Sequence, residues 1–248
     1  MLKASNTSIQ KQLSVAITII GKYDFPQKWE NLMDELVGHL QSSQDFNVIN
    51  GVLSTMHSIT KRYRYELKSE ELWTEIKLVL TKFVEPLTKL FVKIHEDLPN
   101  YSTNKTAVKV LTDSLVLCSK IYYSLSYQEI PEELEDSLDT WMPRFENLLM
   151  LENEIINNDA TEYEPTSIEN LKSNIIEIVN MYTQKYDEEF NRFLQPFIMK
   201  IWELLTKSQE APRFDILVFT GINFLTTIAR RAQTQEIFGV DDPNTNEP

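Results

Sequence analysis

Histidine and cysteine, the side chains best suited to metal binding and nucleophilic catalysis, are few in this chain. The three histidines, His39, His57 and His95, are far apart and lack the close spacing of zinc ligands. Cys118 is the only cysteine, and its place inside the apolar run LVLCSKIYY favours a buried core thiol over a nucleophile. Because no Ser-His-Asp or Cys-His arrangement is recognisable, we expect no catalytic residue.

Metal and phosphate chemistry are also disfavoured. The acidic group Glu132, Glu133, Glu135 and Asp136 follows Pro131, and acids at a helix N-terminus explain this group better than a metal site does. The chain has 5 glycines, none close to another, which argues against a phosphate-binding loop. The sequence therefore predicts no metal and no cofactor, and an enzyme is the least favoured class of protein.

The charge balance limits the class of partner. The 248 residues carry a net charge of −13. Such a chain repels the phosphate backbone, so we expect no nucleic acid partner. The acidic excess suits a basic protein partner, although solubility alone explains it equally well. A single cysteine forms no intrachain disulfide, which is typical of the cytosol or nucleus, and no apolar run approaches the about 18 residues that predict insertion into a membrane.

Apolar residues recur with the spacing of amphipathic helices along the whole chain. Trp29, Leu32, Met33 and Leu36, for example, fall on one helical face. No stretch shows the sustained alternation of a strand, so the predicted fold class is all-α. The pattern predicts nine helical segments, at residues 8–22, 26–42, 45–64, 69–97, 104–126, 131–151, 166–186, 188–207 and 213–232.

The stretch DFPQKW, residues 24–29, lies between the first two segments. We expect Pro26 at the first position of the second helix, where a missing N–H costs nothing. Phe25 and Trp29 are then expected to fill the gap between neighbouring helix pairs. Three other tryptophans fall on apolar stripes and are also expected in the core, namely Trp73, Trp141 and Trp202.

Prolines inside helical segments suggest how the segments are arranged. Pro86, Pro143 and Pro196 each lie well inside a segment whose apolar periodicity continues beyond the proline, so we expect kinks rather than helix ends. They fall in the fourth, sixth and eighth segments and leave the fifth, seventh and ninth without one. This alternation favours a solenoid of HEAT-type helix pairs, each with a bent outer and a straighter inner helix. A compact helical bundle with coincidental prolines is the alternative.

Five stretches of the sequence carry a family resemblance. They are DFPQKW at 24–29, INGVLSTMHSITKRYRYELKSEELWTEIKLVL at 49–80, YYSLSYQEIPEELEDSLDTWM at 122–142, MYTQKYDEEFNRFLQPF at 181–197 and RFDILVFTGINFLTTIAR at 213–230. These stretches resemble the importin-α re-exporters, the CAS or cellular apoptosis susceptibility family of karyopherin-β exportins. The resemblance extends over nearly the whole chain and implies an all-α HEAT-repeat (armadillo-like) solenoid, here of about four and a half helix pairs.

The resemblance also implies a function. Members of this family bind GTP-loaded Ran and importin-α together in the nucleus and release importin-α in the cytoplasm, without catalysing a reaction. We therefore expect a receptor that shuttles between the two compartments, with transient contact with the nuclear pore at the envelope. Family members are much longer than this chain, so we expect a HEAT-repeat segment over residues 1–236 and a disordered or divergent tail over 237–248. Whether the segment binds a partner or is only a structural spring stays open.

The family's inner helices line the concave face that meets its partners, which suggests where contacts lie. Asn50, His57, Lys61 and Arg64 share one side of segment 45–64, and we expect that side to be exposed to a partner. Arginine is suited to pairing with a carboxylate. Alternatively, the cations of KRYR, residues 61–64, only complement the negative end of the helix. The acidic loop 152–167 meets basic stretches of importin-α in one interpretation and is merely solvated in the other.

Overall fold

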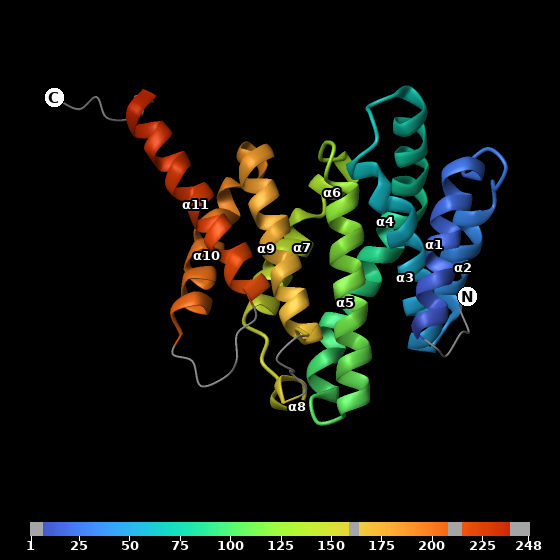
Figure 1. Cartoon of the computed structure of the whole chain (residues 1–248), viewed down its shortest axis with the longest axis horizontal. Helices are drawn as coiled ribbons and strands as arrows, with labels where there is room; N and C mark the ends of the chain where they lie inside the picture. The colour runs from blue at the N-terminus through green and yellow to red at the C-terminus, as the bar shows by residue number, and fades with distance from the viewer. Residues whose placement is uncertain (1–6, 159–163, 208–214, 239–248) are drawn as a thin grey trace.

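Helices make up the regular structure of the described residues. The computed structural model describes residues 7–158, 164–207 and 215–238, and every regular element within them is helical, which confirms the all-α prediction. The chain proceeds from one end of an elongated molecule to the other (Figure 1). In order, the elements are α1 (Thr7–Asp24), α2 (Leu32–Ser42), α3 (Phe46–Thr60), the 3₁₀ helix η1 (Lys61–Arg64), α4 (Glu70–Asp97), the 3₁₀ helix η2 (Leu98–Tyr101), α5 (Lys105–Leu125), α6 (Glu132–Glu135), α7 (Leu138–Leu149), α8 (Glu154–Asn157), α9 (Ser167–Lys185), α10 (Asp187–Thr206) and α11 (Asp215–Phe238).

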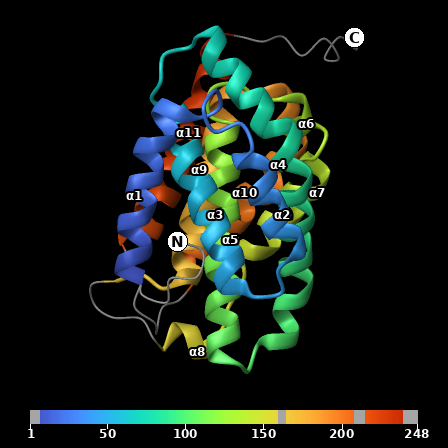
Figure 2. The same cartoon turned by 90° about the vertical axis from the view of Figure 1, so that its right-hand side faces the viewer.

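The long helices form two layers. Layer A contains α2, α4, α7 and α10, and layer B contains α1, α3, α5, α9 and α11; within each layer every helix contacts the next. Figure 2 looks along the stack, with α2, α4 and α7 on one side and α1 on the other. Because contacts join mainly helices that are near in the chain, each repeat is stabilised by its neighbours, as in other stacked repeat proteins.

The interior prolines all lie in layer A. Pro86 is inside α4, Pro143 inside α7 and Pro196 inside α10, and each helix continues on both sides of its proline. Their layer B partners α5, α9 and α11 have no proline inside them. The alternation predicted from the sequence therefore corresponds to the two layers, with layer B in the place of the inner helices.

Buried aromatic residues join successive repeats. Trp141 of α7 stacks on Phe91 of α4 with ring centroids 4.0 Å apart, and its indole N–H donates to Thr88 at 3.1 Å. Tyr122 of α5 lies 4.6 Å from the same indole ring and shares a 2.8 Å hydrogen bond with Tyr182 of α9. The Tyr182 ring in turn lies 5.7 Å from the ring of Phe190 in α10, so one connected aromatic core extends through three repeats.

Several helix boundaries follow local chemistry. Ser69 caps α4 by accepting a hydrogen bond from the Leu72 N–H at 3.1 Å, as its sequence position predicts. Thr166 and Glu169 form a capping box at the start of α9. The predicted segment 131–151 is wrong in one respect, because the helix is interrupted at 136–137 between α6 and α7. Residues 239–248 of the predicted tail lie outside the described residues.

The second helix begins later than predicted. α1 ends at Asp24 and α2 starts at Leu32, so Pro26 is not at a first helical position. Residues 25–28 form a turn closed by backbone bonds to the Asp24 carbonyl, including one of 2.7 Å from Lys28. Phe25 is nonetheless buried and Trp29 packs against the core. Among the other tryptophans, Trp141 is buried and Trp73 is partly buried, but the prediction for Trp202 is wrong, because its side chain is 59% exposed.

Candidate protein-binding surface on layer B

Arg64 lies in η1, the short helix that continues α3, and its guanidinium is bound to α5. Nε and Nη2 donate to the Ser124 hydroxyl at 3.0 and 2.6 Å, and Nη2 also donates to the Lys120 carbonyl at 3.2 Å. The guanidinium carbon lies 4.6 Å from the centre of the Tyr123 ring, a cation–π arrangement. The half-buried Arg64 therefore holds two successive repeats together.

Asn50 and His57 of α3 also lie between the repeats. The Asn50 amide donates to the Val110 carbonyl at 3.3 Å and accepts from the Ser114 hydroxyl at 2.6 Å, so α5 occupies both of its polar atoms. The Nδ1 atom of His57 is buried without a hydrogen-bond partner. Burial, together with smaller effects of the nearby cations Arg64, Lys120 and Lys61, lowers the pKa of His57 from 6.5 to about 3. His57 is therefore neutral at physiological pH.

Lys61 is the one member of the predicted set that is exposed. Its ammonium group makes no hydrogen bond or ion pair within the described part of the chain. The expectation of an exposed side is wrong for Asn50, His57 and Arg64, which are all half-buried. The physical reason is that α5 packs along the same side of α3 that those residues share. A role of these residues in partner binding stays a prediction.

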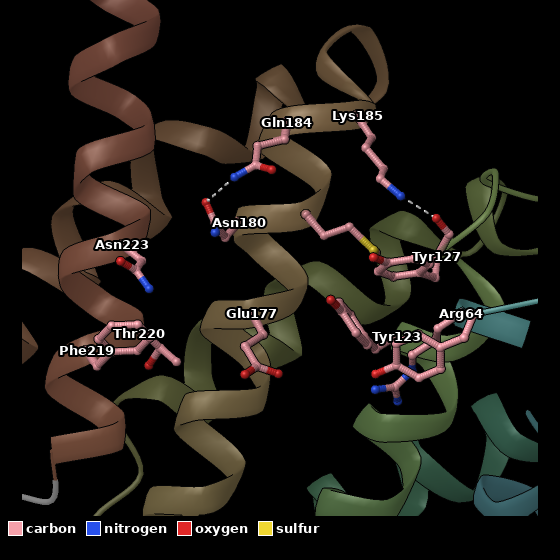
Figure 3. A pocket seen from close by; sticks show the side chains of 12 residues that line it. Arg64, Tyr123, Tyr127, Glu177, Asn180, Gln184, Lys185, Phe219, Thr220 and Asn223 are labelled. Atoms are coloured by element: carbon pink, nitrogen blue, oxygen red, sulfur yellow. Dashed lines mark hydrogen bonds between the residues drawn. The ribbon is translucent and has the colours of Figure 1, made fainter. Parts of the chain in front are cut away.

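Next to Arg64, a groove of about 440 Å³ opens on layer B. Figure 3 shows side chains from α5, α9 and α11 pointing into the same space, with Arg64 and Tyr123 at one side and Phe219, Thr220 and Asn223 at the other. Two large rings remain open to solvent there, since Tyr65 is 77% and Phe219 65% exposed. The groove is lined by Arg64, Tyr65, Tyr123, Tyr127, Glu177, Asn180, Met181, Gln184, Lys185, Phe219, Thr220 and Asn223.

Polar side chains along α9 connect the walls of the groove. The Lys185 ammonium donates to the Tyr127 carbonyl at 2.5 Å and lies 4.0 Å from the centre of the Tyr127 ring. The Gln184 amide donates to Asn180 at 3.2 Å and to the Thr227 hydroxyl of α11 at 3.2 Å. The contacts within α9 and with Tyr127 are visible in Figure 3. The groove is therefore built from side chains that are already held in place.

Two charged side chains at the Arg64 side form no direct ion pair within the described part of the chain. Through their side chains, Lys120 and Glu177 make no hydrogen bond or ion pair among the described residues. Burial lowers the pKa of Lys120. The carboxylates of Glu177 and Asp113 oppose this shift, whereas Arg64 and Lys61 act in the same direction as burial. Partial desolvation raises the pKa of the Glu177 carboxyl, although Arg64 and Lys120 oppose that rise. These charged side chains are better suited to electrostatic recognition of a ligand than to catalysis.

The remaining sequence-derived candidates lie elsewhere. Cys118 is fully buried, and burial raises the pKa of its thiol, as expected for a core residue. Glu132, Glu133, Glu135 and Asp136 are exposed around α6. No group of three or more potential metal ligands comes together among the described residues. Within that same part of the chain, none of the helices has the length and apolar character needed to cross a membrane.

The acidic loop 152–167 is less free than its composition suggests. Glu152 pairs at 2.8 Å with Lys172, whose side chain is only 4% exposed, so this carboxylate neutralises a buried cation of α9. Asn153 caps the short helix α8 and also donates to the Ser102 carbonyl at 2.9 Å. Residues 159–163 lie outside the described residues. The start of the loop therefore has a structural role that neither interpretation from the sequence included.

Sequence reasoning missed most of the groove. Tyr123, Glu177 and Lys185 come from two helices that are far apart in the chain, and none of them was among the predicted site residues. A signal was nonetheless available in the spacing of the repeats. Arg64 meets Ser124 and Tyr122 meets Tyr182, both at a separation of 60 residues. Placing successive layer B helices in that register brings the groove residues of α5 and α9 together.

Comparison with known proteins identifies relatives over nearly the whole chain. A family model described as Cse1 matches residues 59–244. Exportin-2 of Homo sapiens is 47% identical over 245 residues, which is 99% of this chain and 25% of that protein. Exportin-2 of Danio rerio is 47% identical over 238 residues, 96% of this chain and 24% of that protein. This chain therefore spans about a quarter of the length of these relatives.

A solved structure shares the fold. The structure titled "The exportin Cse1 in its cargo-free, cytoplasmic state" superposes with a TM-score of 0.88 at 35% sequence identity, and the match covers 96% of this chain and 26% of that one. The predicted HEAT-repeat solenoid and the resemblance to the CAS exportins are both confirmed.

Proposed function

This chain belongs to the Cse1 family, and we propose that it forms part of a nuclear export receptor that carries importin-α to the cytoplasm together with GTP-loaded Ran. Membership of an exportin family makes the chain part of a transport receptor and not an enzyme. Its function is then stoichiometric binding of protein partners, and the receptor shuttles between nucleus and cytoplasm.

The groove on layer B is the observation that carries this proposal. It combines Arg64 with exposed aromatic rings, Tyr65 and Phe219. Arginine and aromatic residues are enriched where proteins bind one another, and they supply much of the binding energy. The groove lies on the layer that corresponds to the inner helices, which is where an enclosing solenoid meets its cargo.

The stacked repeats suggest how two partners are bound together. Small changes at each repeat interface add up along a solenoid and alter its curvature. If Ran-GTP and importin-α both favour the same curvature, each increases the affinity for the other, and this coupling is reciprocal. GTP hydrolysis on Ran then lowers the affinity for importin-α.

A titration of importin-α tests the proposal, with and without GTP-loaded Ran, on this chain and on the same chain extended to the full length of its relatives. Binding of importin-α by the extended chain only in the presence of Ran-GTP is the expected result. The curve of the shorter chain then gives the contribution of residues 1–248. If the extended chain binds neither protein, the export function is rejected.

Lys61 gives the sharper test of a direct contact. Because Lys61 is exposed and its ammonium group forms no hydrogen bond or ion pair with the described residues, Lys61→Glu should weaken partner binding about fivefold without lowering the melting temperature. Lys77→Glu on α4 is the matched control, since Lys77 is also exposed but lies on layer A. Equal affinities for the two variants would exclude Lys61 as a contact.

A second candidate is a structural spring without partner contacts. Asn50 and Arg64 favour it, because both bind α5 rather than projecting away from it. In that case the chain only transmits curvature between partner-binding regions on either side. Direct binding of Ran-GTP or importin-α to this chain alone argues against the spring, whereas its absence, with binding retained in the extended chain, supports it.

A further inference from the structure

Cations gather at one part of the layer B surface although the chain as a whole carries −13. Lys61 and Arg64 come from η1, Lys120 from α5 and Lys185 from α9. Arg64 and Lys185 line the groove directly, and Lys61 and Lys120 are close enough to Arg64 to affect the titration of the same neighbour, His57. We call these four residues the basic cluster.

The basic cluster is only partly neutralised by the protein itself. Glu177 is the one carboxylate that lines the groove, and it forms no ion pair among the described residues. Arg64 and Lys185 donate to uncharged oxygens of Ser124, Lys120 and Tyr127, so these hydrogen bonds do not pair either cation with a carboxylate. Like charges held together in this way repel one another, so an anion bound among them relieves an existing cost.

We propose that the groove and the cations beside it bind an acidic segment of a protein partner. Its carboxylates face Arg64, which lines the groove, and Lys61 and Lys120 beside it, and an aromatic side chain packs against Tyr65 or Phe219. The inference rests on the proposed function, because it names the chemistry by which a transport partner is recognised. Glu177 then limits the affinity, since it repels the same carboxylates.

Three features favour a polypeptide over other anions. The exposed aromatic rings of Tyr65 and Phe219, which both line the groove, suit apolar side chains between acidic residues. The amides of Asn180 and Asn223 belong to neighbouring helices of the groove, and a carboxamide can both donate to and accept from a peptide group. The strongly negative charge of the remaining chain disfavours a long polyanion such as a nucleic acid.

Fluorescence anisotropy with a defined probe tests this inference. The probe is a fluorescein-labelled peptide of glutamates around a single phenylalanine, and its control replaces every glutamate with lysine. We expect the acidic peptide to bind the 248-residue chain with an affinity that falls as salt is added, and the lysine peptide to bind much more weakly. Equal binding of the two peptides would overturn the proposal.

Substitutions that are expected to change the affinity for the peptide in opposite directions locate the site. Lys120→Glu should weaken binding of the acidic peptide about fivefold, and Lys77→Glu on layer A should leave it unchanged. Glu177→Gln should strengthen binding about twofold to threefold, a gain that loss of folding cannot produce. If Lys120→Glu and Lys77→Glu have the same effect, or if Glu177→Gln does not strengthen binding, the peptide binds elsewhere and the proposal is wrong.

The peptide experiment can be distinguished from the test of the export function, because either can fail while the other succeeds. A chain that binds Ran-GTP or importin-α but not the acidic peptide keeps the proposed function and loses this inference. A chain that binds the acidic peptide at the basic cluster but whose extended form binds neither transport protein keeps the site and loses the function. Competition of RNA or anionic vesicles with the peptide at equal charge concentration would instead indicate a general anion site and would overturn the choice of a protein segment.

Discussion

Mild acid should destabilise this protein through one buried histidine. His57 lies between α3 and α5, its Nδ1 has no hydrogen-bond partner, and three cations, Arg64, Lys120 and Lys61, face it from η1 and α5. Burial is the largest cause of its low pKa, about 3 in the folded protein against 6.5 for a solvated histidine. The unfolded chain therefore takes up a proton at a pH where the folded protein does not.

The magnitude follows from linkage. Above pH 6.5 the imidazole is neutral in both states, so it makes no difference to stability there. Below that pH only the unfolded state is protonated, and the free energy of unfolding falls by about 1.4 kcal/mol per pH unit until the folded pKa is reached. Between about pH 7 and about pH 5 the expected loss from His57 is therefore about 2 kcal/mol.

Urea denaturation of the wild type and of His57→Gln over this pH range is the appropriate assay. Carboxylates and the other two histidines titrate in both proteins, so the difference between the two free energies of unfolding isolates His57. On acidification from about pH 7 to about pH 5, the free energy of unfolding of the wild type should fall by about 2 kcal/mol more than that of the variant. A difference that stays constant with pH, or an NMR titration of the His57 ring with a midpoint near 6.5, would refute the reasoning.

Three further predictions concern stability. Tyr182→Phe should lower the free energy of unfolding by about 1–3 kcal/mol, because it leaves the buried Tyr122 hydroxyl without its 2.8 Å partner. In urea denaturation, the double variant with Tyr122→Phe should be little less stable than the single one; fully additive losses would exclude a coupling between the two hydroxyls. Trp141→Ala should cost about 3–5 kcal/mol and Trp202→Ala about 1 kcal/mol or less, since the first indole is buried and the second is exposed; similar losses in calorimetry would contradict this packing. Arg64→Gln should lower the melting temperature while Lys61→Glu does not, because Arg64 alone is bound to α5; equal melting temperatures would show that the bonds to α5 contribute nothing.

Local chemistry was sufficient to predict most helices. Ser69 and its following acids indicate the start of α4, and the structure shows the expected bond from the Leu72 N–H. Pro86 could be placed inside a helix because apolar residues continue with helical spacing on both sides of it. Such signals concern neighbours within about one or two turns, so the sequence alone contains them.

Depth of burial could not be predicted in the same way. On α10, Ile201 is buried whereas Trp202 and Met199 are exposed, although all three are large apolar side chains of the same amphipathic helix. Periodicity identifies two apolar faces there, but only the packing of α7, α9 and α11 determines which face is covered. The same limit applies to Arg64, whose sequence neighbours gave no indication that Ser124 lies beside it.

Arg64 of layer B takes part both in the contact between two repeats and in the groove, and this double role links partner binding to the shape of the chain. Arg64 stacks on Tyr123 and binds Ser124, so it helps to set how η1 lies against α5. The same guanidinium lines the groove in which we place an acidic segment. A carboxylate bound there competes with the Ser124 hydroxyl for the Arg64 donors, and any change in that bond alters the contact between two repeats. In a solenoid such a local change is transmitted from repeat to repeat. Occupation of the groove is therefore expected to change the curvature of the chain as well as to hold a partner.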